Sequence, residues 1–339
     1  MQARDADAAT RLYDLADVLR PWAIRAAATL RLADHIMAGC RSVAALAKAS
    51  HSNADALHRL LRYLETQGLV LEGPAGHYAL TDVGAALADN HPAQLRSWLD
   101  QDGGMGRADV AAAGILEAVR GGSPVYDHFF GLPFWEDLEG HPDRRRAFDE
   151  LMREQLELPA PHIAAAYDWG DVRHVVDVGG GTGALLAAIL EGSPHARGTL
   201  VDLPRTTEQA RALIRARNLS DRVSVVGRSF FEPLPPGKDV YILNIVLHDW
   251  PDTDAISILR RCAEAASPSG RVLVIESLRS LDGNYLASAM DLYMLILFGG
   301  RERSLEQLDE LFQSAGLRRS RVAGTVGDRS LIECTTIAR

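Results

Sequence analysis

The sequence predicts an α/β protein in which a doubly wound, mostly parallel sheet follows a mostly helical N-terminal region. Two observations predict this fold. From Asp168 onward, short β-prone runs alternate with helical runs, as in "HVVDVG" followed by "ALLAAILEG". Before that point, apolar residues recur at helical spacing, as in "ATRLYDLADVLRPWAIRAAATLRLADHI". Alternation of strands and helices is typical of parallel strands joined by crossover helices.

Three parts are expected along the chain. Residues 1–97 contain a short Ser-capped helix, a longer helix that ends at Gly68, and two β-prone runs around "GPAG". This order of helix, turn, helix and hairpin is typical of a winged helix. Residues 98–166 are expected to form a helical connector, and residues 167–339 are expected to form the sheet domain.

Length and composition are those of an ordinary globular chain. The chain has 339 residues, and its net charge of -9 disfavours nucleic acid, because binding there rests on neutralising phosphates. The N-terminus lacks the apolar stretch of a signal peptide, and no apolar run is long enough to span a bilayer. Cys40, Cys262 and Cys334 form no CxxC pair, so neither a metal site nor a disulfide framework is expected. We therefore expect a cytoplasmic protein with reduced thiols.

A glycine-rich loop follows the first β-prone run of the sheet domain and opens a helix. It reads "DVGGGTGALL", and a GxGxxA pattern runs from Gly179 through Gly181. Glycines let the backbone turn tightly against a ligand, and the helix N-terminus offers free N–H groups, so a nucleotide-like ligand is expected. Asp202 follows the next β-prone run, where NAD enzymes keep the acid that binds ribose, about 20 residues after the loop.

These features alone do not separate NAD from S-adenosylmethionine. Asp177 stands beside the loop, where a carboxylate suits the cationic amino-acid end of S-adenosylmethionine and would repel a pyrophosphate. S-adenosylmethionine is therefore the expected cofactor. A glycine-rich turn that binds no ligand is the alternative interpretation.

Chemically useful side chains follow each of the five β-prone runs. In "YILNIVLHDWPD", for example, His248 and Asp249 come one short turn after a buried strand. Because the carboxyl ends of parallel strands meet at one edge of a sheet, these side chains are expected to share one crevice. The set comprises Asp177, Gly179, Asp202, Ser229, Phe230, Asn244, His248, Asp249 and Glu276.

Roles follow from the chemistry of these groups. Asp202 is suited to accept two ribose hydroxyls, and Phe230 offers a flat face for adenine with Ser229 at its edge. His248 has an ordinary pKa near ~6.5, so a largely neutral imidazole is expected to take a proton from a hydroxyl. Glu276 is expected to accept from the other ring nitrogen and so to fix the tautomer.

Each of these residues also has a purely structural interpretation. A single histidine after a strand is more often a core or capped surface residue, and a glutamate at a strand end is often solvated. Asp249 stands before a helix and is suited to cap it. The placement of all of them at one edge favours the functional interpretation.

The chain resembles bacterial members of the S-adenosylmethionine-dependent O-methyltransferases, a family that also includes plant caffeate-type enzymes. The resemblance covers nearly the whole length and includes "PFWEDL", "DVGGGTG", "LVDLP", "SFFEPLP", "VLHDWPD" and "DLYMLILFGGRERS". "LHDW" followed by "GGRERS" is its most specific part. Within the family, the chain is most similar to enzymes that methylate hydroxylated naphthoates in polyketide tailoring. The resemblance implies a class I methyltransferase fold and a winged-helix domain that dimerises.

The resemblance also implies roles for residues. His248 would be the proton acceptor, flanked by Glu276 and Glu302, the latter from "GGRERS". The cofactor set would be Gly179, Asp202, Ser229, Phe230 and Asn244, to which the residues themselves add Asp177 and Gly181. The acceptor pocket would be lined by Phe148, Met152, Met290, Asp291, Met294 and Phe298, and Asp249 is expected beside them. Two positions depart from the family pattern, because many relatives carry Asp at 229 and Lys, Arg or Ser at 244.

The expected activity is methylation of a phenolic hydroxyl on a small aromatic polyketide intermediate of the hydroxynaphthoate or hydroxybenzoate type, with S-adenosylhomocysteine as the product of the cofactor. A homodimer is expected, with neither nucleic acid nor membrane as partner. An acceptor carboxylate would require a cation, for which the candidates are Arg11, Arg25, Arg107, Arg145, Arg153 and Arg301. Two other classes stay open at this point, a ligand-responsive winged-helix transcription factor and an NAD-dependent oxidoreductase.

Overall fold

The computed structural model describes residues 2–278 and 285–337, which form two compact units. One unit runs from Met1 to Arg107 and the other from Ala108 to Arg339. The finer division at residues 97 and 166 stays a prediction. Within the described part of the chain, no helix combines the length and the apolar character that crossing a bilayer requires.

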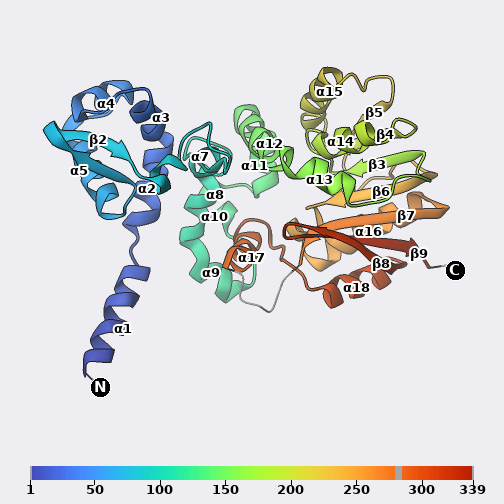
Figure 1. The fold of residues 1–339 in the computed structure, drawn as a ribbon. Coiled ribbons are helices and arrows are strands. Elements are labelled where there is room, and N and C mark those ends of the chain that lie inside the picture. The colour runs from blue at the N-terminus through green and yellow to red at the C-terminus, as the bar shows by residue number, and fades with distance from the viewer. Residues whose placement is uncertain (1, 279–284, 338–339) are drawn as a thin grey trace. The chain divides into compact units, whose positions relative to one another are not determined.

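The first unit consists of helices around one small antiparallel hairpin (Figure 1). The predicted order of helix, turn, helix and hairpin is found. Ser42 and Asn53 cap two of the helices by accepting backbone N–H groups, and Leu57, Leu61 and Leu64 bury one face of the second. The elements are α1 (Gln2–Leu15), α2 (Leu19–Thr29), α3 (Leu32–Met37), α4 (Val43–Ala49), α5 (Ala54–Thr66), β1 (Val70–Gly73), β2 (His77–Leu80), α6 (Asp82–Ala85) and α7 (Leu95–Leu99).

The second unit begins with helices that precede the large sheet. They are α8 (Gly106–Ala111), which straddles the boundary, α9 (Ile115–Gly121), α10 (Tyr126–Phe130), α11 (Phe134–Gly140), α12 (Pro142–Glu157) and α13 (Pro159–Ala165). Proline stands in the first turn of both α12 and α13, where its missing N–H costs nothing.

The second unit is built on a seven-stranded sheet with the order β5-β4-β3-β6-β7-β9-β8. Strands β3 to β7 are parallel, and β9 and β8 extend the sheet in antiparallel fashion. The strands are β3 (His174–Val178), β4 (Arg197–Asp202), β5 (Val223–Gly227), β6 (Lys238–Asn244), β7 (Ala266–Ser277), β8 (Leu317–Val326) and β9 (Arg329–Thr336). The predicted doubly wound sheet is confirmed.

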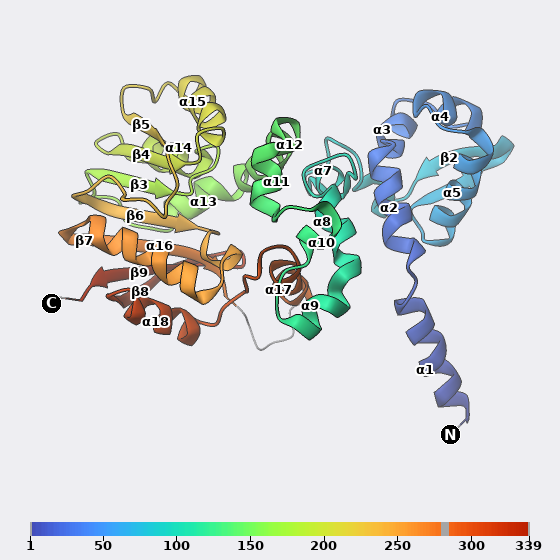
Figure 2. The same cartoon turned by 180° about the vertical axis from the view of Figure 1, so that it is seen from behind.

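Helices cover both faces of this sheet (Figures 1 and 2). Residues of α13, α14 (Ala184–Gly192) and α15 (Thr206–Ala216) pack on one face with Val175 and Ile242 of the strands. Residues of α16 (Asp252–Ala265) and α18 (Leu305–Ser314) pack on the other face with Val176 and Leu243. Because neighbouring strand residues point to opposite faces, continuous apolar runs are needed to bury both.

The order of the strands creates a switch point. The chain runs outward from β3 to β4 and β5, and it then returns to place β6 on the other side of β3. Connections therefore leave β3 and β6 in opposite directions, and this opens a crevice at their carboxyl ends. The remaining helix, α17 (Tyr285–Phe298), precedes the "GGRERS" loop.

Candidate active site

The turn that carries the predicted base follows β6 at the switch point. Residues Leu247–Asp249 form a single 3-10 turn, preceded by Ile245 with a φ of 52°. This left-handed conformation costs a β-branched residue roughly 1–3 kcal/mol, so the surrounding contacts must hold it. One such contact is the hydrogen bond from the N–H of Ile245 to the carbonyl of Ile275, at 2.8 Å.

Glu276 holds this turn through its backbone. Its Oε1 accepts the N–H groups of Val246 at 3.1 Å and Leu247 at 2.7 Å, and the residue is 3 % exposed. The expected hydrogen bond from Glu276 to the imidazole of His248 is therefore wrong for this structure, because the backbone of the turn reaches that carboxylate first. Glu276 acts on the ring through its charge alone.

Glu302 makes the contact that was expected of Glu276. Its Oε1 lies 2.9 Å from Nδ1 of His248, and its side chain is 2 % exposed. In the neutral imidazole, Nδ1–H donates to this carboxylate and Nε2 keeps a lone pair. Asp249 flanks that nitrogen, with Oδ1 at 3.4 Å from Nε2. The ring is thus fixed at Nδ1, and a second carboxylate stands beside Nε2.

The "GGRERS" loop can approach the turn because residue 300 has no side chain. A Cβ at Gly300 would lie 2.0 Å from the carbonyl oxygen of His248, which is impossible without displacing backbone. The next residue, Arg301, donates its N–H to that same carbonyl at 2.9 Å. Asp291 accepts the N–H of Glu302 at 2.8 Å, so this predicted pocket residue orients Glu302 beside His248.

Arg303 is a buried arginine that joins the "GGRERS" loop to the histidine turn, and sequence reasoning gave it no role. It is 3 % exposed and donates to the carbonyls of Leu247 and Trp250, both at 2.7 Å, and to Asp252. These bonds tie the loop to both sides of "LHDW". The signal was present as the second arginine of "GGRERS", but an arginine in a polar loop is ordinarily a solvated charge.

The cluster of carboxylates changes the protonation of the imidazole. Burial by itself lowers the pKa of His248, but the charge of Asp249, the hydrogen bond to Glu302 and the charge of Glu276 outweigh it. Together they raise the pKa of His248 to about 10. These carboxylates stabilise the imidazolium, an effect that an isolated histidine lacks and that the sequence does not reveal. Burial also raises the pKa of Asp249, to about 7, against the opposing charge of His248.

The glycine loop on the neighbouring strand has the geometry of a ligand cradle. Gly179 and Gly181 have φ values of 71° and 58°, in the left-handed region that glycine adopts freely. Asp202 supports the turn by accepting the N–H of Gly181 at 2.8 Å and that of Leu203 at 2.7 Å. Phe230 closes one side, since a Cβ at Gly179 would lie 3.5 Å from its ring.

Two buried oxygens beside this loop lack hydrogen-bond partners within the described residues. They are Oδ2 of Asp177, at the end of β3, and Oδ1 of Asn244, at the end of β6. Asp177 is 2 % exposed, and burial followed by the nearby charge of Asp202 raises its pKa to about 7. Open acceptors at a switch point suit a ligand that brings hydrogen-bond donors and positive charge, as the amino-acid end of S-adenosylmethionine does.

Ser229 and Phe230 stand in the turn after β5. The hydroxyl of Ser229 accepts the N–H of Phe231 at 3.2 Å, so it shapes the turn and keeps its own hydrogen for another acceptor. Phe230 meets Phe231 and Trp250 edge to face, with ring centres 5.2 and 5.8 Å apart. The position of Trp250 in this aromatic cluster fits both packing and contact with a cofactor.

Two predicted acceptor residues belong to an aromatic cluster from α11, α12 and α17. Trp135 stacks on Phe298 at 5.3 Å and 14°, and it meets Phe148 edge to face at 5.7 Å. Sequence reasoning quoted "PFWEDL" but gave Trp135 no role. Met294 is 4 % exposed, and Met152 and Met290 are half-buried on α12 and α17.

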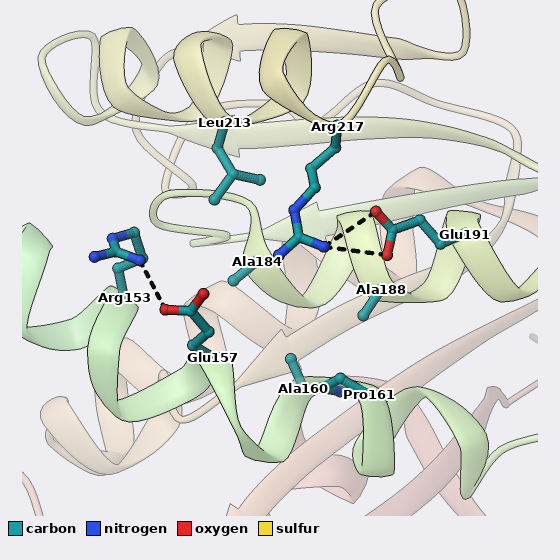
Figure 3. A pocket seen from close by; sticks show the side chains of 9 residues that line it. All are labelled: Arg153, Glu157, Ala160, Pro161, Ala184, Ala188, Glu191, Leu213 and Arg217. Atoms are coloured by element: carbon teal, nitrogen blue, oxygen red, sulfur yellow. Dashed lines mark hydrogen bonds and ion pairs between the residues drawn. The ribbon is translucent and has the colours of Figure 1, made fainter. Parts of the chain in front are cut away.

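A small surface pocket between α12, α13, α14 and α15 lies apart from these residues (Figure 3). Figure 3 shows its charges paired, Arg153 with Glu157 at 2.8 Å and Arg217 with Glu191 at 3.2 Å. Arg153, a candidate cation for an acceptor carboxylate, is thus engaged within its own helix. Arg145 is buried among acids, and Arg301 is exposed.

Comparison with known proteins identifies the family. Residues 113–318 match the O-methyltransferase domain, and residues 13–90 match the O-methyltransferase dimerisation domain. The chain therefore belongs to the O-methyltransferase family. The expected enzyme class, a methyltransferase that uses S-adenosylmethionine, is confirmed. Neither a transcription factor nor an NAD-dependent oxidoreductase is the family found.

Particular relatives narrow the comparison. The chain is 46% identical to a 2,7-dihydroxy-5-methyl-1-naphthoate 7-O-methyltransferase from Streptomyces carzinostaticus, covering 96% of this chain and 97% of that protein. A solved O-methyltransferase from neocarzinostatin biosynthesis, in complex with S-adenosyl-L-homocysteine and 1,4-dihydroxy-2-naphthoic acid, is 45% identical. It has a TM-score of 0.91, with 96% of this chain and 98% of that chain covered.

One similar protein is named for different chemistry. An aclacinomycin 10-hydroxylase from Streptomyces purpurascens is 42% identical, covering 100% of this chain and 93% of that protein. Overall similarity therefore does not by itself assign the reaction, and the groups around His248 must be considered separately.

Proposed function

We propose that this protein methylates a phenolic hydroxyl on a hydroxynaphthoate- or hydroxybenzoate-like intermediate of natural-product biosynthesis, with His248 as the general base. The observation that carries the proposal is the imidazole held at Nδ1 by Glu302, with the carboxylate of Asp249 at 3.4 Å from Nε2. The similarity to a naphthoate 7-O-methyltransferase, and to a 3-amino-4-hydroxybenzoate 4-O-methyltransferase at 35% identity, supports this class of acceptor.

The proton is the part of the reaction that these residues manage. Nε2 of His248 accepts the hydrogen of the phenol, and the phenolic oxygen becomes the nucleophile. Asp249, Glu276 and Glu302 surround the resulting imidazolium with negative charge, so proton transfer to the ring is favoured. A pKa of about 10 on His248 is comparable to that of a phenol, so the proton is shared readily between the two.

S-adenosylmethionine supplies an electrophilic methyl group on a sulfonium centre. Asp202 would accept its ribose hydroxyls, and Phe230 and Ser229 would contact its adenine. Asp177 and Asn244, whose oxygens are open within the described part of the chain, would accept hydrogen bonds from its amino-acid end. Gly179 and Gly181 would let the backbone approach it. General-base help of this kind contributes typically ~10²–10⁴-fold, and alignment of the reactants contributes more.

The matched dimerisation domain leads us to infer a homodimer formed through the N-terminal helices. Leu12, Tyr13 and Leu15 of α1 are 68%, 85% and 71% exposed, which is unusual for a row of large apolar side chains. A second copy of the chain would cover them. A monomer in light scattering at micromolar concentration would contradict this inference.

A panel of acceptors tests the proposed reaction. Hydroxynaphthoates, hydroxybenzoates and their methyl esters are incubated with S-adenosylmethionine, and the products are identified by mass spectrometry. We expect an added methyl on the aromatic hydroxyl and S-adenosylhomocysteine as co-product. An added oxygen atom instead would indicate hydroxylation, the chemistry named for the relative from S. purpurascens, and would overturn the proposal. Equal turnover of acid and ester would remove the need for an arginine at the carboxylate.

A further inference from the structure

The side chain of Arg145 lies between the two proposed ligand sites, and the proposed reaction makes no use of it. Arg145 is 6 % exposed although it carries a full charge. It stands on α12, the helix that also carries Phe148 and Met152 of the proposed acceptor pocket. Burying an ion is costly unless its partners offset the lost hydration, so the partners indicate the role.

The polar partners of Arg145 join α12 to the cofactor side. Nη2 lies 3.9 Å from Oδ1 of Asp202 and donates a hydrogen bond to the hydroxyl of Thr206. Nε lies 2.9 Å from Oδ1 of Asp149, one helical turn further along α12. The other oxygen of Asp149 accepts from Gln209 of α15 at 3.1 Å. The guanidinium therefore connects the acceptor-side helix with the carboxylate proposed to bind ribose.

Arg145 also contacts the aromatic cluster. Its guanidinium carbon lies 6.0 Å from the centre of the Trp135 ring, at the outer limit of a cation–π contact. Trp135 in turn stacks on Phe298 and meets Phe148 edge to face. The guanidinium of Arg145 thus lies near Asp202 on one side and, on the other, near Trp135, which packs against two residues of the proposed acceptor pocket.

Three carboxylates surround the single positive charge of Arg145. Carboxylate oxygens of Asp149, Asp202 and Glu139 lie 2.9, 3.9 and 3.3 Å from its nitrogens. Burial raises the pKa of Asp202, and Arg145 opposes this rise. Ribose hydroxyls that donate to Asp202 would supply part of the stabilisation that Arg145 now provides. The guanidinium would then interact more strongly with Asp149 and Trp135. As a result α12, which carries both Arg145 and Asp149, would be held more firmly.

We propose that Arg145 is a positioning residue that couples the two sites, so that the aromatic acceptor binds more tightly to the cofactor-loaded protein than to the free protein. This proposal rests on the proposed function for the identity of both ligands. What the proposal adds is a coupling between the binding of the cofactor and the binding of the acceptor, which neither ligand site has by itself.

Calorimetric titration of the full-length protein measures this coupling. The probes are S-adenosylhomocysteine and 1,4-dihydroxy-2-naphthoate, each titrated alone and in the presence of the other. In the unchanged protein, we expect S-adenosylhomocysteine to lower the Kd of the acid by about fivefold or more, the lower end of typical coupling. In Arg145→Gln the two values of Kd are expected to converge. Arg145→Lys is expected to fall between, because one ammonium cannot reach Asp149 and Asp202 together.

The neighbouring Arg146 provides a matched control. It stands on the solvent side of the same helix and pairs with Asp143 at 2.6 Å. Arg146→Gln removes the same charge one residue away, and its coupling is expected to equal that of the unchanged protein. Loss of coupling in Arg146→Gln as well would overturn the assignment to Arg145.

The remaining outcomes separate this proposal from the proposed function. Coupling that persists in Arg145→Gln, or that is absent from an unchanged protein that binds both probes, overturns it. An unchanged protein that binds no S-adenosylhomocysteine contradicts the proposed function instead. If circular dichroism shows that Arg145→Gln is unfolded, Asp149→Asn replaces it, because this change keeps the shape and loosens Arg145 from α12. Undiminished coupling in folded Asp149→Asn overturns the proposal.

Discussion

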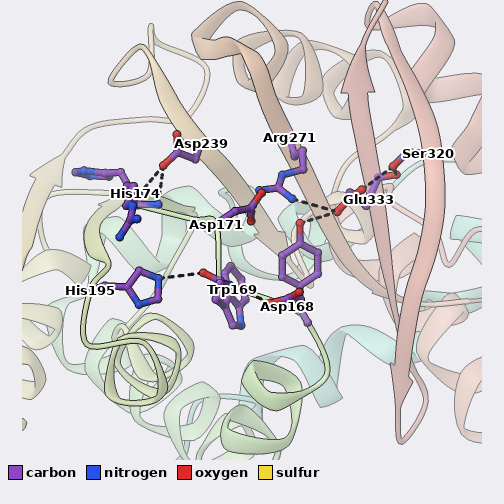
Figure 4. A network of polar contacts seen from close by, with 12 residues as sticks. Asp168, Trp169, Asp171, His174, His195, Asp239, Arg271, Ser320 and Glu333 are labelled. Atoms are coloured by element: carbon purple, nitrogen blue, oxygen red, sulfur yellow. Dashed lines mark hydrogen bonds and ion pairs between the residues drawn. The ribbon is translucent and has the colours of Figure 1, made fainter.

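The two edges of the large sheet differ in whether their buried polar groups have hydrogen-bond partners. At the edge where β3 and β6 begin, polar groups satisfy one another in a network that reaches inward to Glu333, which lies mid-strand on β9 opposite Leu273 (Figure 4). Glu333 accepts hydrogen bonds from Tyr167 at 2.6 Å and from Ser320 at 2.8 Å, and it pairs with Arg321 at 3.2 Å. Nearby, Asp239 accepts the backbone N–H of His174 at 2.8 Å. This complete pairing indicates that the network stabilises the fold.

At the opposite edge, four buried carboxylate or amide oxygens lack hydrogen-bond partners among the residues that the structure describes. They belong to Asp177, Asn244, Glu276 and Glu302. Leaving such groups open costs roughly 1–3 kcal/mol each, so a sequence selected for stability alone would not keep four of them together. The carboxyl edge therefore leaves polar groups open for a ligand, and the unliganded protein is less stable as a result.

The largest expected effect concerns the proposed base. His248→Gln removes the proposed acceptor of the phenol proton, and we expect kcat to fall by ~10²–10⁴-fold while the Kd of S-adenosylhomocysteine is unchanged. Steady-state kinetics with the best acceptor of the panel and calorimetry with S-adenosylhomocysteine measure both quantities. Undiminished turnover would mean that this edge holds ligands without proton transfer to the imidazole.

Glu302→Gln is expected to act on the same ring with a smaller loss. A hydrogen bond to a charged group contributes about 1.5–3 kcal/mol, which corresponds to a decrease in kcat of about 10- to 100-fold. Because Glu302 raises the pKa of His248, its neutralisation lowers that pKa, and the rising limb of kcat/KM against pH moves to lower pH. A pH profile with an unmoved limb would show that Glu302 is not the group that supports the imidazolium.

Glu333→Gln tests the other edge. Burial opposes ionisation of Glu333, but hydrogen bonds from Arg321, Tyr167 and Ser320 outweigh it and lower its pKa. A lowered pKa stabilises the fold above the unfolded-state value, and this contribution is lost as the pH falls. We expect thermal unfolding at pH 7 to show a loss of about 1–3 kcal/mol, which shrinks in acid, with kcat unchanged. A loss of activity in the folded variant would erase the contrast between the edges.

Asp177→Asn is expected to change stability in the opposite direction. Burial raises the pKa of Asp177 to about 7, so the folded protein holds a proton that the unfolded chain releases between about pH 4 and 7. Ionisation therefore costs stability as the pH rises through this range, and the asparagine variant avoids the cost. We expect a higher Tm at pH 8, where each kcal/mol of avoided cost raises Tm by about 2–4 °C. No gain is expected in acid, and S-adenosylhomocysteine should bind more weakly. A lower Tm at pH 8 would show that the ionised carboxylate is stabilised by the fold.

Sequence reasoning reached those features that depend on chain order. The glycine loop, Asp202 and His248 stand at the carboxyl ends of β3, β4 and β6, and parallel strands necessarily deliver them to one edge. It gave Glu276 the contact with the ring nitrogen that Glu302 makes, because which carboxylate reaches a ring depends on a backbone turn that no local pattern specifies. It gave Trp135 and Arg303 no role and left Arg145 among six candidate cations, since a helix residue or loop arginine resembles ordinary packing or solvation. The antiparallel β8 and β9 were likewise outside the reach of the predicted alternation.

The absence of a side chain at Gly300 makes the proposed proton transfer depend on a residue with no chemistry of its own. A single methyl group there would force the "GGRERS" segment away from the histidine turn. The carboxylate of Glu302 would retreat with it, and the imidazole would lose its orientation although every ionisable group remained in the chain. Tolerance to substitution at this position therefore measures how closely two segments distant in the chain must approach for the proton to move.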